Sequence, residues 1–175
     1  MYKSHKALLI VDMLNDFVQE GAPLEVPASR WIIENIAGEI RYAREKKRPI
    51  IYLCDCHASD DPEFEYWSPH AVKGTQGAEV IQQLTPQPED YIVEKTGYSG
   101  FFNTNLEMLL DELEIDEILI CGVLTNISIL YTAVDALQRG IRVTVPETCV
   151  AGLNEEDHTF ALRQVSELLK PVIRE

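Results

Sequence analysis

Short apolar runs alternate along the chain with longer segments in which apolar residues recur at helical spacing. The runs have the length and composition of strands that are buried on both faces of a sheet. The predicted strands span residues 6–11, 49–54, 91–93, 118–121 and 143–145, with 172–173 as a candidate edge strand. The predicted helices span residues 29–46, 79–84, 104–113 and 154–169, and a further one follows with Thr125 or Asn126 as its cap.

This alternation predicts one doubly wound, Rossmann-like α/β domain over residues 1–175, with a parallel sheet and helices on both faces. Residues 15–17 and 20–23 are expected to form a loop after the first strand. Open sheets of this kind place their functional residues at the carboxyl ends of the strands. The polar residues that follow each predicted strand are therefore the first candidates for chemistry.

The segment 117–139 reads as a strand, a tight turn at Gly122 and a helix, with Ser128 in the first helical turn. Backbone N–H groups at a helix start have no intrahelical partner, and the helix dipole is positive there. Proteins place nucleophiles or bind anions at such a position. Taken alone, however, the segment favours a simpler interpretation, a Ser/Thr capping cluster on an ordinary strand–helix unit.

The net charge and the hydropathy of the chain argue against some classes of binding partner. The net charge of −14 argues against nucleic acid and anionic membranes, which both need a basic face. No apolar run approaches the roughly 20 residues of a membrane span, and the first residues lack the layout of a signal peptide. We therefore expect a cytoplasmic protein with four buried, unpaired cysteines.

Asp12, Lys95 and Ser128 follow three different predicted strands. A right-handed winding would bring those strand ends together. Each residue also has an ordinary explanation: Asp12 as a turn cap, Lys95 as a solvated loop charge and Ser128 as a helix cap. Residue types and order alone leave both interpretations open.

A second group of polar residues lies in the aperiodic segment 57–77, which is long for a loop within a compact domain. Asp55 and His57 are two residues apart on an extended segment, so their side chains point the same way. Together with His70 and an intervening carboxylate such as Glu63, they suit zinc or another divalent first-row ion. A polar loop with scattered histidines is the competing explanation. His5 and His158 are expected to be solvated or to cap helices.

Three motifs spread over the chain, LLIVDMLNDF, EKTGYSGF and GVLTNIS, together resemble the isochorismatase-like cysteine hydrolases, a group that includes nicotinamidases and isochorismatases. The resemblance implies an Asp12–Lys95–Cys catalytic triad, with Ser128 at the position that is cysteine in the amidase branches. It also implies an oxyanion hole from the backbone N–H groups of Leu124 and Ser128, and a cis peptide bond between Val123 and Leu124.

The segment CDCHASDDPEFEYWSPHAVKGTQGAE resembles the metal loop of nicotinamidases. The resemblance implies one divalent metal, most simply zinc, held by Asp55, His57 and His70. Glu63 takes the place of a fourth ligand in one nicotinamidase branch, and Asp61 and Glu65 are its rivals.

The resemblance also implies how the substrate is held. Phe17 and Trp67 lie where the family places residues that stack on a ring, and Leu124 would contact the substrate. Tyr98 and Phe101, close to Lys95, are further candidates for the pocket wall. The expected partner is a small amide, nicotinamide or an analogue, and we expect a homo-oligomer.

The implied reaction is the hydrolysis of nicotinamide to nicotinate and ammonia, a step of pyridine nucleotide salvage and NAD biosynthesis. Ser128 should impair it, because a serine hydroxyl has a very high pKa and this triad offers no histidine base. We favour an engineered replacement of cysteine over a natural divergence, because every other site element is present. The alternatives are another small-amide hydrolase, an isochorismatase-like vinyl-ether hydrolase, or a ligand-binding homologue without catalysis.

Overall fold

A computed structural model describes residues 5–168 and 172–174 of the chain. Its strands are β1 (Lys6–Val11), β2 (Ile50–Asp55), β3 (Tyr91–Lys95), β4 (Glu117–Val123), β5 (Arg142–Pro146), β6 (Val150–Ala151) and β7 (Val172–Arg174). Its α-helices are α1 (Asn15–Val18), α2 (Ser29–Glu45), α3 (Leu106–Glu112), α4 (Leu130–Gln138) and α5 (Glu155–Arg163). Within these residues no helix is long and apolar enough to cross a membrane.

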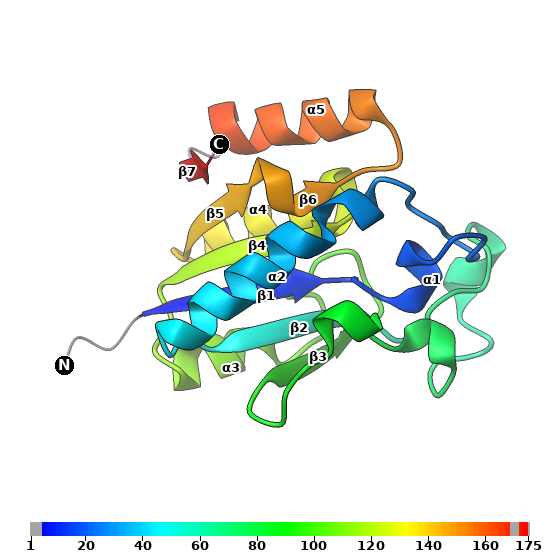
Figure 1. The fold of residues 1–175 in the computed structure, drawn as a ribbon, viewed down its shortest axis with the longest axis horizontal. Coiled ribbons are helices and arrows are strands. Elements are labelled where there is room, and N and C mark those ends of the chain that lie inside the picture. The colour runs from blue at the N-terminus through cyan, green and yellow to red at the C-terminus, as the bar shows by residue number, and fades with distance from the viewer. Residues whose placement is uncertain (1–4, 169–171, 175) are drawn as a thin grey trace.

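The strands form one sheet in the order β3-β2-β1-β4-β5-β7, and the short β6 pairs with the end of β4. Every pairing is parallel. The chain winds from β1 outward to β3 and then returns to β4 on the other side of β1 (Figure 1). The gap between the ends of β1 and β4 is therefore the switch point, where open α/β sheets bind their ligands.

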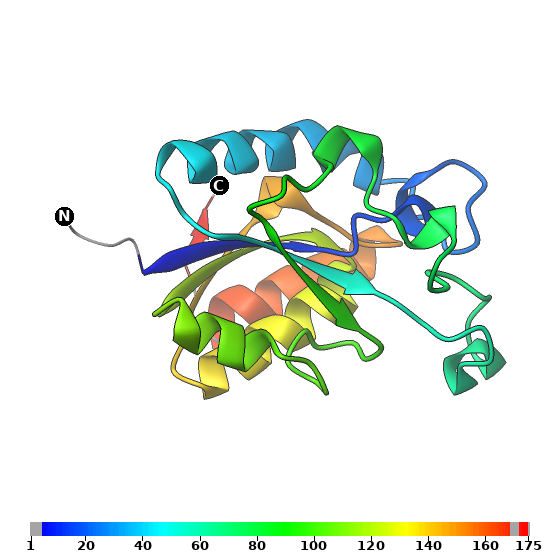
Figure 2. The same ribbon diagram turned by 90° about the horizontal axis from the view of Figure 1, so that it is seen from below.

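Helices cover both faces of the sheet, and each face carries its own apolar core. Figure 2 shows α2 on one face and α3, α4 and α5 on the other. Side chains alternate between the cores along β1: Leu9 and Val11 pack towards α3, α4 and α5, whereas Leu8 and Ile10 pack towards α2. Double-sided burial explains why the strands read as continuous apolar runs in the sequence.

The strand predictions hold to within a few residues, including the edge strand β7, whereas the two-residue β6 was not predicted. The prediction of a loop at 15–17 is wrong, because α1 forms there with Phe17 and Val18 buried. The helix predicted at 79–84 is replaced by a single 3₁₀ turn, Gln82–Leu84, and another 3₁₀ turn, Gln76–Ala78, precedes it. These elements are too short to produce a periodic pattern.

The caps of the two C-terminal helical segments differ from each other. Asn154 caps α5 as predicted, because its side chain accepts a hydrogen bond from the Asp157 N–H. The helix after β4 was predicted to be capped by Thr125 or Asn126. It begins as a π-helical turn, Thr125–Ile129, and its N-cap is Leu124, without a side-chain cap. The Thr125 hydroxyl is engaged elsewhere, 2.8 Å from His158 Nδ1 on α5.

Candidate active site

The polar residues predicted at strand ends meet at the carboxyl edge of the sheet. Asp12 follows β1, Asp55 and Lys95 end β2 and β3, and Ser128 lies in the turn after β4. Gly122 permits the close approach of β4 to β1 beneath this edge. Its φ is +120°, and a Cβ there would lie 2.0 Å from the carbonyl oxygen of Val11.

Lys95 is the centre of the cluster. Its Nζ lies 2.8 Å from Asp12 Oδ2 and forms an ion pair with Asp55 Oδ1. The same ammonium donates a long hydrogen bond of 3.4 Å to Ser128 Oγ. Asp12 Oδ1 accepts a 2.9 Å hydrogen bond from the backbone N–H of Asp55. Asp12, Lys95 and Ser128 are all buried, so the structure brings the three predicted triad residues together.

Two carboxylates and one ammonium share this buried space, and their pKa values respond accordingly. Burial, together with repulsion from Asp55, raises the pKa of Asp12 to about 6 despite the attraction of Lys95. Burial would also raise the pKa of Asp55, but Lys95 and His57 outweigh it, and the net direction is downward. Burial would lower the pKa of Lys95, but the two carboxylates reverse this effect and raise it. Asp12 is therefore the group of this cluster that titrates nearest neutrality.

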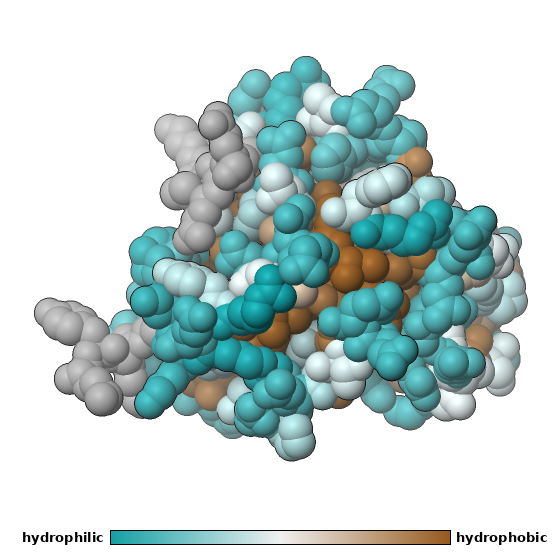
Figure 3. All heavy atoms as spheres, in the orientation of Figure 1, coloured by the Kyte–Doolittle hydropathy of each residue, from teal (hydrophilic) through white to brown (hydrophobic). Residues whose placement is uncertain are grey.

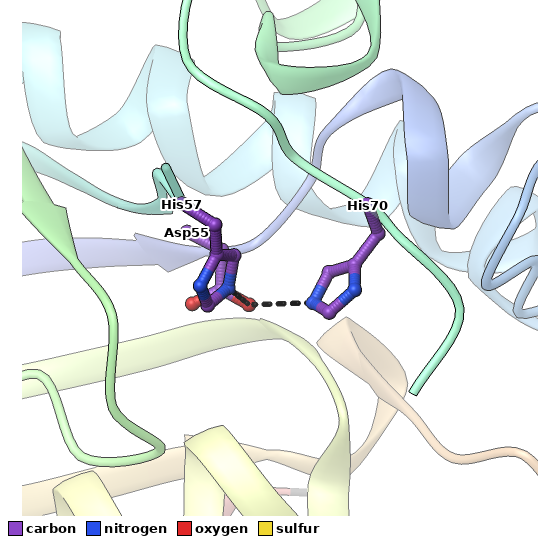
Figure 4. Close-up of side chains that lie close together, drawn as sticks. All are labelled: Asp55, His57 and His70. Atoms are coloured by element: carbon purple, nitrogen blue, oxygen red, sulfur yellow. Dashed lines mark ion pairs between the residues drawn. The ribbon is translucent and has the colours of Figure 1, made fainter. Parts of the chain in front are cut away.

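Asp55 also faces the two predicted metal-binding histidines. Its Oδ2 lies 3.9 Å from His57 Nε2 and 4.0 Å from His70 Nε2, and Figure 4 shows both rings directed at the carboxylate. One ligand atom from each residue lies within 4.8 Å of the others. His57 Nε2 is buried and has no hydrogen-bond partner among the residues that the structure describes. An orphaned, buried nitrogen is costly unless it serves another purpose, and a bound cation would provide one.

The other ring nitrogen of each histidine is fixed by an acceptor. His70 Nδ1 lies 2.8 Å from the carbonyl oxygen of Ser68, and His57 Nδ1 lies 3.1 Å from Asp61 Oδ2. Both oxygens accept hydrogen bonds, so each Nδ1 acts as a donor and each Nε2 is directed at Asp55. This is the arrangement that metal-binding histidines use. Burial opposes protonation of His57, but Asp55 and Asp61 outweigh it and raise its pKa to about 9, so protons would compete with a metal.

The carboxylates of the loop divide into different roles. Asp61, considered above as a rival ligand, holds His57 and accepts a 2.9 Å hydrogen bond from the N–H of Glu63. A carboxylate oxygen of Glu63 lies within 4.8 Å of ligand atoms of His57 and Asp61. Glu63 is not part of the set of close ligand atoms formed by Asp55, His57 and His70. Its side chain lines the pocket beside the triad, and burial raises its pKa. The sequence pattern could not separate these acids, because it shows only their spacing.

A small pocket of about 40 Å³ is lined by Asp12 and Ser128 of the triad and by His70. Its lining contains Asp12, Phe17, Leu24, Asp55, Glu63, Trp67, His70, Tyr98, Val123, Leu124, Ile127 and Ser128. The predicted contact residues Phe17, Trp67 and Leu124 are thus placed together at the triad. Phe101 is not part of the pocket, because it is buried in the core on the far face of β1, where Arg139 stacks on its ring at 4.7 Å.

Two contacts near the site had no sequence signal. The centroid of the Phe64 ring lies 5.6 Å from the ring centroids of both His57 and His70, so Phe64 packs against the histidine pair. His158, expected to be solvated or to cap a helix, is half-buried and joins α5 to the turn that carries Ser128 through Thr125. The peptide bond between Val123 and Leu124 is cis, as the family resemblance implied.

A much wider surface groove lies apart from this chemistry. It has a volume of about 1,090 Å³ and runs between α2 and the segment 76–86. It contacts Asp55 but none of the triad residues. Figure 3 shows hydrophobic atoms along the centre of the face that carries α2, among mostly hydrophilic side chains. Size alone therefore does not identify the site, and the convergence of charged groups does.

Comparison with known proteins decides the family. The model of the isochorismatase domain matches residues 6–175. The chain belongs to the isochorismatase family. This confirms the superfamily indicated by the three sequence motifs and places the chain among the isochorismatase-family hydrolases.

Solved members of the isochorismatase family share the fold along nearly the whole chain, which confirms the predicted α/β class. Nicotinamidase PncA from Bacillus subtilis superposes with a TM-score of 0.93 and 32% identity, covering 98% of this chain and 99% of its own. A pyrazinamidase of Pyrococcus horikoshii in complex with zinc superposes with a TM-score of 0.91 and 31% identity, with the same coverage. A curated relative, a probable inactive nicotinamidase of Arabidopsis thaliana, is 33% identical over 87% of this chain and 84% of its own.

Proposed function

We propose that this chain carries the site of a metal-dependent nicotinamidase in which Ser128 occupies the position of the nucleophile. The observation that carries the proposal is the placement of Lys95 Nζ between the Asp12 carboxylate and Ser128 Oγ, at 2.8 Å and 3.4 Å. Aspartate, lysine and a nucleophile in one buried pocket form the machinery of acyl transfer. The nicotinamidase and pyrazinamidase names of two solved relatives agree with this assignment.

Asp12 would serve as the proton carrier. Its pKa of about 6 lets it accept a proton from the nucleophile at neutral pH and return that proton to the departing ammonia. Lys95 would stabilise the ionised nucleophile and fix the carboxylate of Asp12. The backbone N–H groups of Leu124 and Ser128 would stabilise the oxyanion of the tetrahedral intermediate. Asp12, Leu124 and Ser128 line the pocket, and Lys95 contacts both Asp12 and Ser128.

Ser128 limits the reaction in the chain as it stands. A cysteine beside Lys95 would be partly ionised near neutrality, whereas a serine hydroxyl would not. The pocket lining includes one histidine, His70, and its Nδ1 is engaged with Ser68 while its Nε2 faces Asp55. The site therefore offers Ser128 no free imidazole base, and we expect very slow turnover.

Asp55, His57 and His70 would hold the divalent metal, and zinc is our proposal because a solved relative contains it. The donor set of two imidazoles and one carboxylate suits zinc. When bound, the ion would supply a Lewis acid that accepts the lone pair of a pyridine nitrogen. Phe17 and Trp67 would then flank the ring and direct its amide towards Ser128.

A second candidate is the hydrolysis of a vinyl ether, as in isochorismatase. Asp12 favours it, because a buried carboxyl with a pKa of about 6 can act as a general acid without any help from a thiol. Serine at position 128 is compatible with that reaction. The orphaned His57 Nε2 and its alignment with Asp55 and His70 have no role in it, and we therefore place it second.

A third candidate is ligand binding without catalysis, which the probable inactive nicotinamidase of Arabidopsis brings into consideration. A substrate screen separates the three candidates. The Ser128→Cys variant and the unmodified chain are each assayed with nicotinamide and with isochorismate. Release of ammonia by the cysteine variant supports the nicotinamidase site, and isochorismate hydrolysis by both proteins supports the second candidate. Inactivity of both proteins on both substrates leaves the binding role.

A further inference from the structure

A second hollow opens directly beside the triad pocket and has no role in the chemistry proposed above. It has a volume of about 480 Å³. Its lining contains Glu63, Gly97, Tyr98, Ser99, Phe102, Tyr131, Val134 and Asp135. These residues come from the loop after β3, from α4 and from the metal loop. We call this hollow the aromatic groove.

Three aromatic side chains form the walls of the groove and remain largely exposed: Tyr98 at 47%, Phe102 at 58% and Tyr131 at 48%. Tyr98 and Tyr131 stack with their ring centroids 6.2 Å apart and their planes inclined by 23°. Gly97 lets Phe102 lie against the loop, because a Cβ on Gly97 would come within 2.6 Å of the Phe102 ring. Exposed aromatics gathered in a hollow mark a binding surface more often than isolated ones do.

The groove is continuous with the triad pocket. Glu63 and Tyr98 line both hollows, and Trp67 Nε1 donates a long hydrogen bond of 3.5 Å to Tyr98 Oη. The triad pocket alone, at about 40 Å³, is far smaller than the roughly 300–1,000 Å³ typical of a ligand site. The aromatic groove falls within that range. A ligand with its amide at Ser128 can therefore extend over Tyr98 into the groove.

We propose that the aromatic groove binds a second, neutral aromatic ring carried by the amide substrate, so that the preferred substrates are larger than nicotinamide. This inference rests on the proposed amidase function. Flat apolar walls suit an aromatic ring, and the carboxyl groups of Glu63 and Asp135 disfavour an anionic one. They also disfavour a second copy of this chain, whose net charge is −14, as the occupant.

Calorimetric titration of the zinc-loaded chain tests the inference, because the slow turnover expected with Ser128 lets binding reach equilibrium. The probes are nicotinamide and its 5-phenyl and 6-phenyl derivatives. We expect at least one derivative to bind about tenfold more tightly than nicotinamide, since an added aromatic pair contributes on that order. Phe102→Ala and Tyr131→Ala should each remove most of this gain and change the nicotinamide affinity little. Phe160→Ala, which removes a ring of similar exposure on α5, should keep the gain.

Three outcomes would overturn the inference. If nicotinamide binds and neither phenyl derivative binds more tightly, the groove does not take the second ring, and the proposed function survives. If none of the three probes binds, the proposed function fails and this inference fails with it. If sedimentation shows a dimer that Phe102→Ala dissociates, a second copy covers the groove.

Discussion

Asp12 illustrates how one residue acquires its chemistry from its surroundings. The sequence placed it at a strand end, but only the structure shows that it shares a buried ammonium with Asp55. The loss of solvent and the repulsion from the second carboxylate raise the pKa of Asp12 to about 6. Neither cause can be seen in the sequence motif. A general base with this pKa is ionised and usable at neutral pH.

This pKa predicts the pH dependence of a catalytically competent variant. Asp12 must be ionised to accept a proton, so kcat/KM of Ser128→Cys for nicotinamide should fall about tenfold per pH unit below about pH 6 and level off above it. Initial rates measured from pH 4.5 to 8 at saturating zinc give the profile. A rate that stays constant between pH 5 and 7 would show that Asp12 is not the proton acceptor.

Asp61 is a residue whose role the sequence left open, and the structure assigns it to His57 Nδ1 rather than to the metal position. Removing its charge should weaken the orientation of the ring. We expect Asp61→Asn to lower zinc affinity by about 10- to 100-fold, as the loss of such supporting contacts does. Competition with a chromophoric chelator measures the affinity, and Asp60→Asn, an exposed neighbour, is the matched control. Equal zinc affinities of the two variants would show that Asp61 does not support metal binding.

At the scale of elements, the sequence correctly predicted the strands that are buried on both faces and the long helix α2. The strands were found because burial on both faces makes their runs continuously apolar, and α2 was found because its apolar stripe extends over several turns. The helix α1, the strand β6 and the 3₁₀ turns were missed or misplaced, since two to four residues cannot establish a period. The cap of the helical segment after β4 was also misplaced: its N-cap is Leu124, and the Thr125 hydroxyl bonds to His158, 33 residues away in the sequence.

Alanine substitutions at two glycines, one in β4 and one in α2, test how closely the neighbouring atoms are packed around them. Gly122→Ala should destabilise the fold by at least about 3 kcal/mol, because φ is +120° and the new Cβ would lie 2.0 Å from Val11 O. Gly38→Ala should instead stabilise by about 0.5–1 kcal/mol, since Gly38 is within α2 and the nearest atom to its Cβ is 3.8 Å away. Urea unfolding measures both changes. A tolerated alanine at 122 would show that β1 and β4 can separate without cost.

At the scale of the molecule, the site is assembled from strand ends that lie far apart in the sequence. The motifs predicted which residues converge, because the carboxyl ends of parallel strands share one edge. They could not predict the geometry of the loop carboxylates, the packing of Phe64 on the histidines or the aromatic groove, which depend on packing between loops. The single domain over residues 1–175, the homo-oligomer and the cytoplasmic location stay predictions.

Asp55 belongs to β2, whereas His57 and His70 belong to the loop that follows it. A metal bound by all three would tie this loop to the sheet in the folded state, so metal binding should stabilise the fold. Zinc at 100 times its dissociation constant would add about 2.7 kcal/mol to the free energy of unfolding. We therefore expect the melting temperature to rise with zinc and to fall with a chelator, and His70→Ala to abolish this response. Scanning calorimetry gives the measurement. A zinc response that persists in His70→Ala would place the metal elsewhere.

The central claim is that this site hydrolyses nicotinamide when position 128 carries a thiol. The most direct test is the rate of ammonia release from nicotinamide by the unmodified chain, by Ser128→Cys and by Ser128→Cys combined with Asp12→Asn. We predict that the cysteine variant is faster than the unmodified chain by several orders of magnitude, because only a thiol beside Lys95 ionises near neutrality. The Asp12→Asn change should abolish the gain. Equal rates for the unmodified chain and Ser128→Cys would contradict the cysteine-hydrolase account.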